Sequence, residues 1–195
     1  FVGAEILRRS LGRGAADKAH VDAELRRHFD EDIVWLGDAP GDFPHHHVMM
    51  YMVPLDDHTV LVGDPRAGAA LAAADPAGAS LAVDADLEGH ARRFDHVAEL
   101  LAGRGFEVVR MPVVVLAGAG AYLTYTNALF DREPATAGAP ARPVVYLPTY
   151  AVPSLDEAAA AQYRGLGFEV RPVDVSGIYH LNGSIGCLVN VMARS

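Results

Sequence analysis

The sequence predicts an α/β fold built from a repeated unit of strand, helix and strand. The tetrapeptide Gly-Phe-Glu-Val at residues 105–108 returns at residues 167–170, and each copy follows a helix-like stretch with Arg and Gly at its end. Short runs rich in Val, Ile and Tyr, bounded by Gly, Pro and Asp as strands usually are, alternate with these stretches. A single unit cannot cover its own apolar faces, so we expect several units to pack side by side or to close into a ring.

Three copies of the unit can be traced along the chain. In the first we expect the end of a strand at 1–3, a helix at about 15–29, and strands at 33–36 and 47–55. In the second we expect a strand at 59–65, a helix at 88–102, a strand at 106–109 and a closing strand segment at 122–130. In the third we expect a strand at 144–150, a helix at 154–163, a strand at 168–173 and a closing segment at 186–192. Ser154, followed three residues later by Glu157, predicts the start of the third helix. Residues 66–80, rich in Ala and Gly, do not discriminate between helix and loop.

These units predict a single domain over residues 1–195, with copies at about 1–57, 58–131 and 143–195. Residues 131–142, with Pro134, Gly138 and Pro140 among small side chains, are typical of a surface loop between the second and third copies. The chain opens at Phe1, inside what reads as the end of a strand, so we expect the natural protein to continue upstream.

Composition excludes several classes of protein. The 195 residues carry a formal net charge of −9 and are 51% hydrophobic. A chain of this length can form one core that buries roughly 70% of its unfolded surface. The acidic balance and the scattered arginine pairs disfavour nucleic acid as a partner. No apolar run reaches the roughly 20 residues of a membrane helix. The single cysteine cannot form an intramolecular disulfide, so we expect a reducing, cytoplasmic location.

A closed ring would bring the last strand of each copy to a central axis. His47, Asn127 and Cys187 stand at equivalent places in the three copies, near the start of those strands. A lone cysteine is often a buried space-filler, and an asparagine at a strand start is often a turn or capping residue. His45 and His47 would share one face of a strand, but no second cluster of metal ligands accompanies them, so we expect no metal site.

The order of these motifs resembles the guanidine-modifying, or pentein, superfamily. The residues that carry the likeness are Phe-Val-Gly at 1–3, His47, Thr-Val-Leu-Val-Gly-Asp-Pro at 59–65, Tyr-Thr-Asn at 125–127, Val-Tyr-Leu-Pro-Thr-Tyr at 145–150 and Asn-Gly-Ser-Ile-Gly-Cys at 182–187. The superfamily contains arginine, agmatine and peptidylarginine deiminases, dimethylarginine dimethylaminohydrolases and amidinotransferases. The resemblance implies an α/β propeller of five ββαβ units with an active site at its centre. About three of the five units would be present, and the N-terminal ones would be absent.

The resemblance also implies roles for individual residues. Cys187 matches the superfamily's nucleophile and His47 its catalytic histidine. Met49 stands where deiminases keep an aspartate that binds the guanidinium, although dimethylarginine dimethylaminohydrolases also lack that aspartate. Asn127 would line the pore, and Arg8 lies near the place of an arginine that binds a substrate carboxylate in some members, within a motif that does not match. No cofactor is implied.

The expected activity is hydrolysis of a C–N bond in arginine, a methylarginine or an agmatine-like compound. A thiolate is the side chain best suited to attack a resonance-stabilised guanidinium, and an imidazole can donate and then accept the proton. The expected partner is therefore a small cationic guanidino substrate, with the remainder of the same protein or a second copy of the chain as a further partner. Three alternatives stay open: amidino transfer, a non-catalytic pentein used as a binding protein, and a structural repeat with an inert cysteine.

Overall fold

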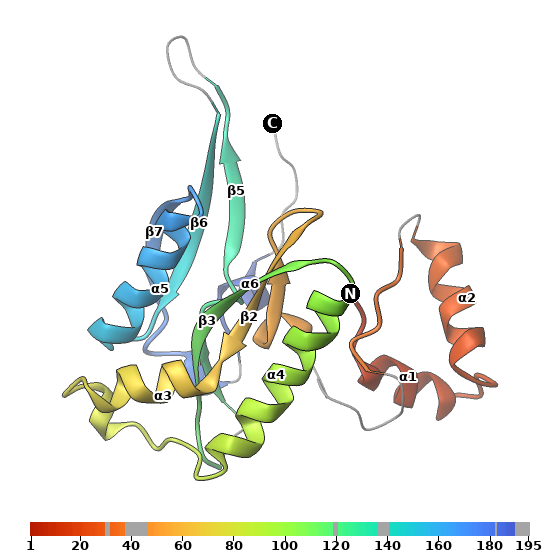
Figure 1. Cartoon of the computed structure of the whole chain (residues 1–195), viewed down its shortest axis with the longest axis horizontal. Coiled ribbons are helices and arrows are strands. Elements are labelled where there is room, and N and C mark those ends of the chain that lie inside the picture. Colours follow the sequence, from red (N-terminus) through yellow and green to blue (C-terminus); the bar gives the residue numbers. More distant parts are fainter. Residues whose placement is uncertain (30–31, 38–46, 119–120, 136–140, 182, 190–195) are drawn as a thin grey trace.

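The computed structural model describes residues 1–29, 32–37, 47–118, 121–135, 141–181 and 183–189 (Figure 1). The helices are α1 (Ala4–Leu11), α2 (Lys18–His28), α3 (Pro65–Ala73), α4 (Leu87–Gly103), α5 (Pro153–Gly165) and α6 (Ile185–Leu188), with the 3-10 helices η1 (Val48–Met50), η2 (Gly78–Ser80) and η3 (Tyr179–Leu181). The strands are β1 (Met52–Pro54), β2 (Thr59–Asp64), β3 (Glu107–Val115), β4 (Tyr122–Thr124), β5 (Leu129–Glu133), β6 (Arg142–Thr149) and β7 (Glu169–Asp174). None of the helices that the structure describes is both long and apolar enough to cross a membrane.

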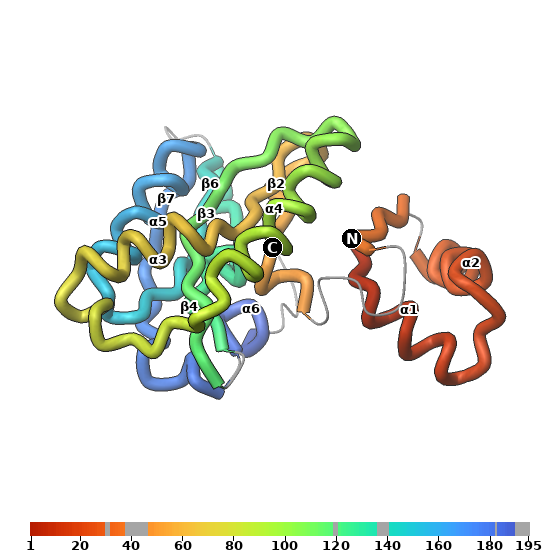
Figure 2. The backbone as a smooth tube through the Cα atoms, turned by 60° about the horizontal axis from the view of Figure 1, so that its bottom comes forward, coloured from red at the N-terminus to blue at the C-terminus, as the bar shows by residue number. Residues whose placement is uncertain are grey.

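The strands form two sheets with the same internal pattern. One has the order β1-β2-β3-β4 and the other the order β5-β6-β7. In both, an antiparallel pair (β1 with β2, β5 with β6) is followed by a parallel pair (β2 with β3, β6 with β7). The helices α3 and α4, with η2 between them, connect β2 to β3, and α5 connects β6 to β7 (Figure 2). The predicted strand–helix–strand repeat is therefore confirmed in the second and third copies.

The first copy has the same connection in reduced form. Val2 and Trp35 pair as an isolated parallel bridge, with α1 and α2 between them in the chain. Two backbone bonds hold this bridge: the Val2 N–H donates to the Val34 carbonyl at 2.8 Å, and the Leu36 N–H donates to the Val2 carbonyl at 2.9 Å. The strand expected at 33–36 thus has ladder contacts only around Trp35. The boundaries proposed for the three units and for the domain remain predictions.

The repeated Gly-Phe has a conformational cause. Gly105 and Gly167 adopt φ values of +90° and +88°, which glycine reaches without the steric cost that a Cβ imposes. The following N–H groups turn back onto the helices, Phe106 to Leu101 at 3.2 Å and Phe168 to Tyr163 at 3.0 Å. This is the hydrogen bond of a helix-ending Schellman motif. Each glycine therefore ends a helix and directs the chain into the parallel strand.

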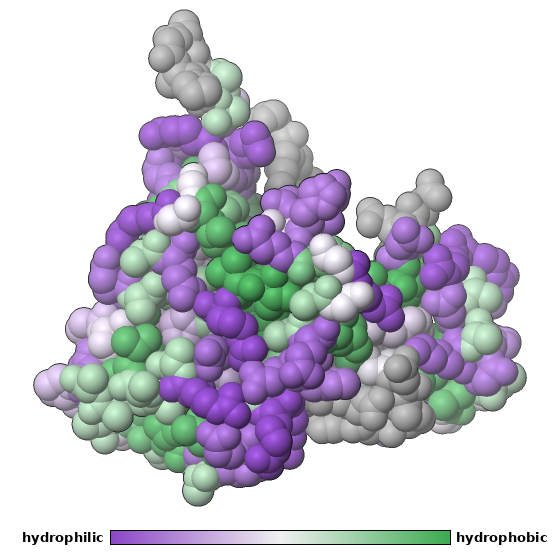
Figure 3. Space-filling view, viewed as in Figure 1, coloured by the Kyte–Doolittle hydropathy of each residue, from purple (hydrophilic) through white to green (hydrophobic). Residues whose placement is uncertain are grey.

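Within the described residues the core forms three clusters. The first draws on both sheets, with Leu61 of β2 and Leu147 of β6, and lies under α5. The second lies under α4 and includes Phe94 and Leu101. The third joins α1 and α2 to Trp35. Hydrophilic residues cover much of the face drawn in Figure 3, and a hydrophobic patch lies over β2 and β3 near its middle.

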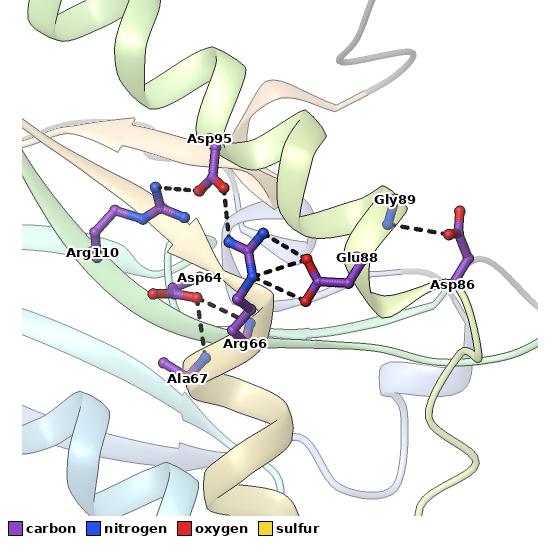
Figure 4. Close-up of polar contacts among 8 residues, drawn as sticks. All are labelled: Asp64, Arg66, Ala67, Asp86, Glu88, Gly89, Asp95 and Arg110. Atoms are coloured by element: carbon purple, nitrogen blue, oxygen red, sulfur yellow. Dashed lines mark hydrogen bonds and ion pairs between the residues drawn. The ribbon is translucent and has the colours of Figure 1, made fainter.

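A network of charged side chains fixes α3 and α4 against β3. The Arg66 guanidinium donates to Glu88 at 2.8 Å and to Asp95 at 2.8 Å, and Arg110 lies 2.9 Å from the second oxygen of Asp95 (Figure 4). Asp64 accepts from the Arg66 and Ala67 N–H groups and so caps α3. The stretch 66–80, which the sequence left unassigned, therefore begins as a capped helix.

Three expected elements are wrong. Residues 47–55 do not form one strand, because Val48–Met50 is the 3-10 helix η1 and the strand begins at Met52. Residues 122–130 split into β4 and β5, which belong to different sheets. In the closing segment 186–192, residues 186–188 belong to helix α6, Val189 follows it in an extended conformation, and residues 190–192 lie outside the described residues.

Two details of the helices also differ from expectation. The helix α1 was not predicted. The helix α5 begins at Pro153, and Ser154 does not cap it, because its hydroxyl donates to the Leu71 carbonyl at 3.0 Å. The Ser154 N–H in the first turn of α5 donates to Asp75 Oδ2 at 2.8 Å, and Asp156 accepts from the Val152 N–H at 3.2 Å. The hydrogen bond from Ser154 to Leu71 of α3 therefore takes the place of the capping box that the sequence predicted at Ser154 and Glu157.

The two glycines at the end of α4 provide a matched pair for testing the turn. An added Cβ would meet no atom within 4 Å at either Gly103 or Gly105, so the two differ mainly in backbone conformation. We expect Gly105→Ala to lower the free energy of unfolding by about 1 kcal/mol. Gly103→Ala should raise it by roughly 0.5–1 kcal/mol, since helical alanine restricts the unfolded chain. Urea unfolding measures both, and a stabilising Gly105→Ala would contradict the interpretation.

Candidate functional site

The only cysteine lies on the surface, in a short helix near the C-terminal end of the described chain. Cys187 is exposed and belongs to α6. Its backbone N–H donates to the Ser184 carbonyl at 2.9 Å, so the first turn of α6 fixes its backbone. The residue is therefore exposed as a whole while the fold holds its backbone. The interpretation of Cys187 as a buried space-filler is wrong.

The buried side-chain amide of Asn127 contacts the Cys187 sulfur. Asn127, which follows β4, is fully buried, and its Nδ2 lies 3.0 Å from Cys187 Sγ and 3.3 Å from Met50 Sδ. The Gly186 N–H approaches the Asn127 carbonyl at 3.5 Å. Segments 60 residues apart in the chain thus meet at Cys187.

Close packing at Gly186 makes this contact possible. A Cβ at position 186 would lie 2.4 Å from Asn127 Oδ1 and 3.1 Å from the Met49 methyl carbon. Real Cβ atoms essentially never approach other atoms as closely as the first of these distances. Gly186 therefore allows α6 to rest directly on Asn127, with Met49 beside it.

Buried polar side chains surround this contact and form what we call the buried polar cluster, comprising Thr124, Thr126, Asn127, Tyr150 and Ser184. The Thr126 hydroxyl donates to the Met49 carbonyl at 2.8 Å and shares a hydrogen bond with Thr124 at 2.9 Å. The Thr124 hydroxyl also lies 3.3 Å from the Met50 carbonyl, and its single proton is available to either the Met50 carbonyl or the Thr126 oxygen. These bonds attach η1, which follows His47, to the segment that carries Asn127.

Tyr150 joins the same cluster to α6. Its hydroxyl donates to the Thr124 carbonyl at 2.7 Å, accepts from the Thr124 N–H at 3.2 Å, and lies 3.4 Å from Ser184 Oγ. Burial raises the pKa of Tyr150 to about 12, with a small contribution from nearby Cys187. Tyr150 is therefore neutral at physiological pH and acts as a hydrogen-bonding group.

The Asp156 carboxylate holds the Tyr150 backbone by a hydrogen bond. The carboxylate accepts from the Tyr150 N–H at 3.0 Å and from the Tyr125 hydroxyl at 2.7 Å. Burial raises the pKa of Asp156 above its ordinary value, and these hydrogen bonds oppose that shift. Between them, Ala151 adopts a φ of +58°, unusual for a residue with a side chain. The backbone between β6 and α5 is thus held in a strained conformation beside the cluster.

The predicted site residues fall into two places. Cys187, Asn127 and Met49 come together as described. His47 is exposed at the start of η1 and lines a cavity of about 280 Å³ with Gly3, Glu5, Ile6, Arg9 and Val48. Met49 brings the η1 segment to α6, so His47 stands two residues from a side chain that touches position 186.

Arg8 lies on the exposed face of α1. Its guanidinium contacts both carboxylate oxygens of Glu5, at 2.5 and 2.6 Å. The arginine that lines the cavity with His47 is its neighbour Arg9. The suggested contact of Arg8 with a substrate carboxylate stays a prediction, as do the roles of the other predicted site residues.

The sequence did not reveal Thr124, Tyr150, Asp156 or Ser184 as members of the site. Each lies in or beside a segment whose apolar pattern predicted only a strand or a helix. The strand Arg142–Thr149 ends one residue before Tyr150, and a polar group at the end of a buried strand was the one available indication. Within the described residues, no three His, Cys, Asp or Glu side chains converge as metal ligands, and His45 and His46 lie outside those residues.

Comparison with known proteins identifies the fold. No protein-family model matches the sequence, and no curated protein matches it. An agmatine deiminase from C. jejuni superposes with a TM-score of 0.61 at 19% identity, over 95% of this chain and 49% of that one. A cysteine-to-serine variant of that enzyme with substrate bound gives 0.60 at 18% identity, over 95% of this chain and 50% of the other. A Porphyromonas gingivalis protein provisionally assigned as an arginine deiminase gives 0.56 at 20%, over 88% and 46%.

The chain therefore has the fold of the pentein deiminases. It spans about half the length of the structures it resembles. The partial set of units that the sequence predicted fits this coverage.

Removal of one hydroxyl tests the cluster. Tyr150→Phe leaves the buried N–H and carbonyl of Thr124 without this partner, so we expect the free energy of unfolding to fall by about 1–3 kcal/mol. Tyr179, whose ring packs edge-on against Tyr150 at 5.9 Å, provides the matched control. Tyr179→Phe should change stability by less than about 0.5 kcal/mol. Equal losses in the two variants, measured by urea unfolding, would contradict the proposed role of the Tyr150 hydroxyl.

Proposed function

We propose that this chain carries the nucleophile of an enzyme that hydrolyses a C–N bond of a guanidino compound. The single observation that carries the proposal is the exposed residue Cys187, whose sulfur lies 3.0 Å from a buried amide within a pentein fold. Similar structures include an agmatine deiminase, which supports a guanidino group as the substrate's reactive part. An inert cysteine would need neither the exposure nor the buried polar cluster beneath it.

The first half of the proposed reaction forms a covalent intermediate. The Cys187 thiolate attacks the central guanidinium carbon, and a C–S bond forms while one C=N π pair moves to nitrogen. Protonated His47 gives its proton to the departing nitrogen, and that C–N bond breaks to release ammonia or an amine. The product bound to the enzyme is a cationic amidino-thioether. This alternation of acid and base suits an imidazole, which titrates near neutral pH.

The second half regenerates the thiolate. Neutral His47 takes a proton from water, the hydroxide oxygen bonds to the amidino carbon, and the C–S bond then breaks with its electron pair on sulfur. The product is a urea derivative, and its extra proton passes to the released amine, which leaves as an ammonium ion. The net reaction consumes one guanidinium and one water and needs no cofactor. If an amine replaces water in this half, the same site performs amidino transfer.

The two predicted catalytic side chains give the first test, to be performed on the complete protein. Arginine, agmatine and methylated arginines are the assay substrates, with release of ammonia or amine as the readout. We expect Cys187→Ser to lower kcat by at least ~10³-fold, because a neutral hydroxyl is a poor nucleophile. His47→Asn should lower it by about 10²–10⁴-fold. His58→Asn, in the exposed turn before β2, is the control and should retain full activity.

The outcome of this assay also separates the proposal from its main rival. A pentein that only binds guanidino compounds would show no turnover on any substrate, and Cys187→Ser would leave binding by calorimetry unchanged. That pair of results would overturn the enzymatic proposal.

Met49 provides a second test, because it sets the substrate class. The Met49 methyl group lies beside position 186. An aspartate in place of Met49 would offer the guanidinium a carboxylate there. An apolar side chain favours an N-alkylated guanidine, whereas Met49→Asp adds a charge-assisted acceptor for unsubstituted N–H groups. We expect Met49→Asp to raise the kcat/KM ratio of arginine to dimethylarginine by about tenfold or more. Met49→Leu, which conserves volume and polarity, should leave that ratio unchanged, and an equal shift in both variants would contradict this role.

A further inference from the structure

We propose that Asn127 is a positioning residue that stabilises the reactive, ionised form of Cys187 by donating its amide N–H to the sulfur. This inference rests on the proposed nucleophilic role of Cys187. Asn127 is fully buried, and the expectation that it lines the pore and binds substrate stays a prediction.

The neighbouring methionine fixes which way the carboxamide points. Asn127 Nδ2 lies within 3.3 Å of Met50 Sδ as well as 3.0 Å from Cys187 Sγ. A thioether sulfur has no proton and can only accept, so the amide nitrogen is the atom that belongs between the two sulfurs. The opposite orientation would bring the amide oxygen against the lone pairs of Met50. Cys187 therefore receives a donor.

The other end of the carboxamide bears the cost of this orientation. Asn127 Oδ1 is buried and makes no hydrogen bond within the described part of the chain. An unmet buried acceptor costs roughly 1–3 kcal/mol, and such groups are rare enough in native proteins to require a cause. The cause here is that the donor end is committed to the two sulfurs, while Oδ1 faces the backbone of Gly186.

The chemical consequence concerns the charge on sulfur. A donated N–H stabilises the thiolate more than the thiol, because the charged acceptor forms the stronger hydrogen bond. The thiolate is the nucleophile. Met50 keeps the amide turned toward Cys187, and Gly186 lets α6 approach the amide closely enough for the contact. Asn127, Met50 and Gly186, from three segments of the chain, thus together favour the ionised form of the Cys187 sulfur.

Alkylation of the single cysteine tests this directly, since iodoacetamide reacts with the thiolate and the chain contains no other cysteine. We expect Asn127→Leu to lower the labelling rate at about pH 7 by about tenfold. At about pH 10, above the ~8.5 at which a free cysteine ionises, the variant and the natural protein should label at similar rates. A change that merely altered access to the sulfur would lower both rates equally.

Gln162→Leu on α5 is the matched control, because its amide oxygen is also buried without a partner in the described residues, and it should label like the natural protein. Equal labelling of folded Asn127→Leu and natural protein at pH 7, or an equal loss at both pH values, would overturn the inference. If Asn127→Leu does not fold, Gly186→Ala takes its place: the added methyl displaces the amide, and unchanged labelling of that folded variant would overturn it equally. The assay needs no substrate, so absence of turnover would defeat the proposed function alone.

Discussion

The contact between Asn127 and Gly186 is the constraint on which the candidate site depends. A Cβ at position 186 would stand 2.4 Å from the amide oxygen, so only glycine lets α6 rest on the buried polar cluster. With that spacing, the amide nitrogen reaches the Cys187 sulfur at 3.0 Å while the residue as a whole stays exposed. The position of the Cys187 thiol is thus set by the packing of Gly186 against Asn127 and by the buried amide of Asn127.

The repeat supplies the frame for this contact. The second and third copies carry the chain through an antiparallel and then a parallel pairing, and in both a glycine with positive φ ends the helix between the parallel strands. Because the copies pack side by side, the segment after β4, the η1 turn and α6 converge although they lie far apart in the chain. Tyr150 and Asp156, between β6 and α5, then join this convergence to the larger core.

Much of the fold could be predicted from the sequence because its indications are local. The strands at Thr59–Asp64, Arg142–Thr149 and Glu169–Asp174 follow apolar runs, and the glycines at 105 and 167 fall where their backbone requires them. The failures come from long-range contacts. Ser154 looked like a helix cap but donates to Leu71, and the segment at Cys187 is the short helix α6, whose Gly186 packs on Asn127.

The site was predictable only in part, for the same reason. Position within the repeat selected Cys187 and Asn127, and the structure brings them into contact. Position within the repeat could not indicate that Asn127 is buried or that Tyr150 and Ser184 form a cluster around it. Burial of a polar group depends on partners from other segments. Met49, expected at a position that binds the guanidinium in deiminases, lies beside Gly186, the residue before Cys187.

A covalent intermediate on Cys187 is the most direct test of the central claim that this thiol is a nucleophile toward guanidinium carbon. The complete protein would be mixed with a guanidino substrate, quenched in acid during turnover and analysed by intact and peptide mass spectrometry. The account predicts an added amidino group, with the retained substituent of the substrate, on the peptide that contains Cys187. Turnover with that peptide unmodified, and with activity retained after replacement of the cysteine by serine, would contradict it.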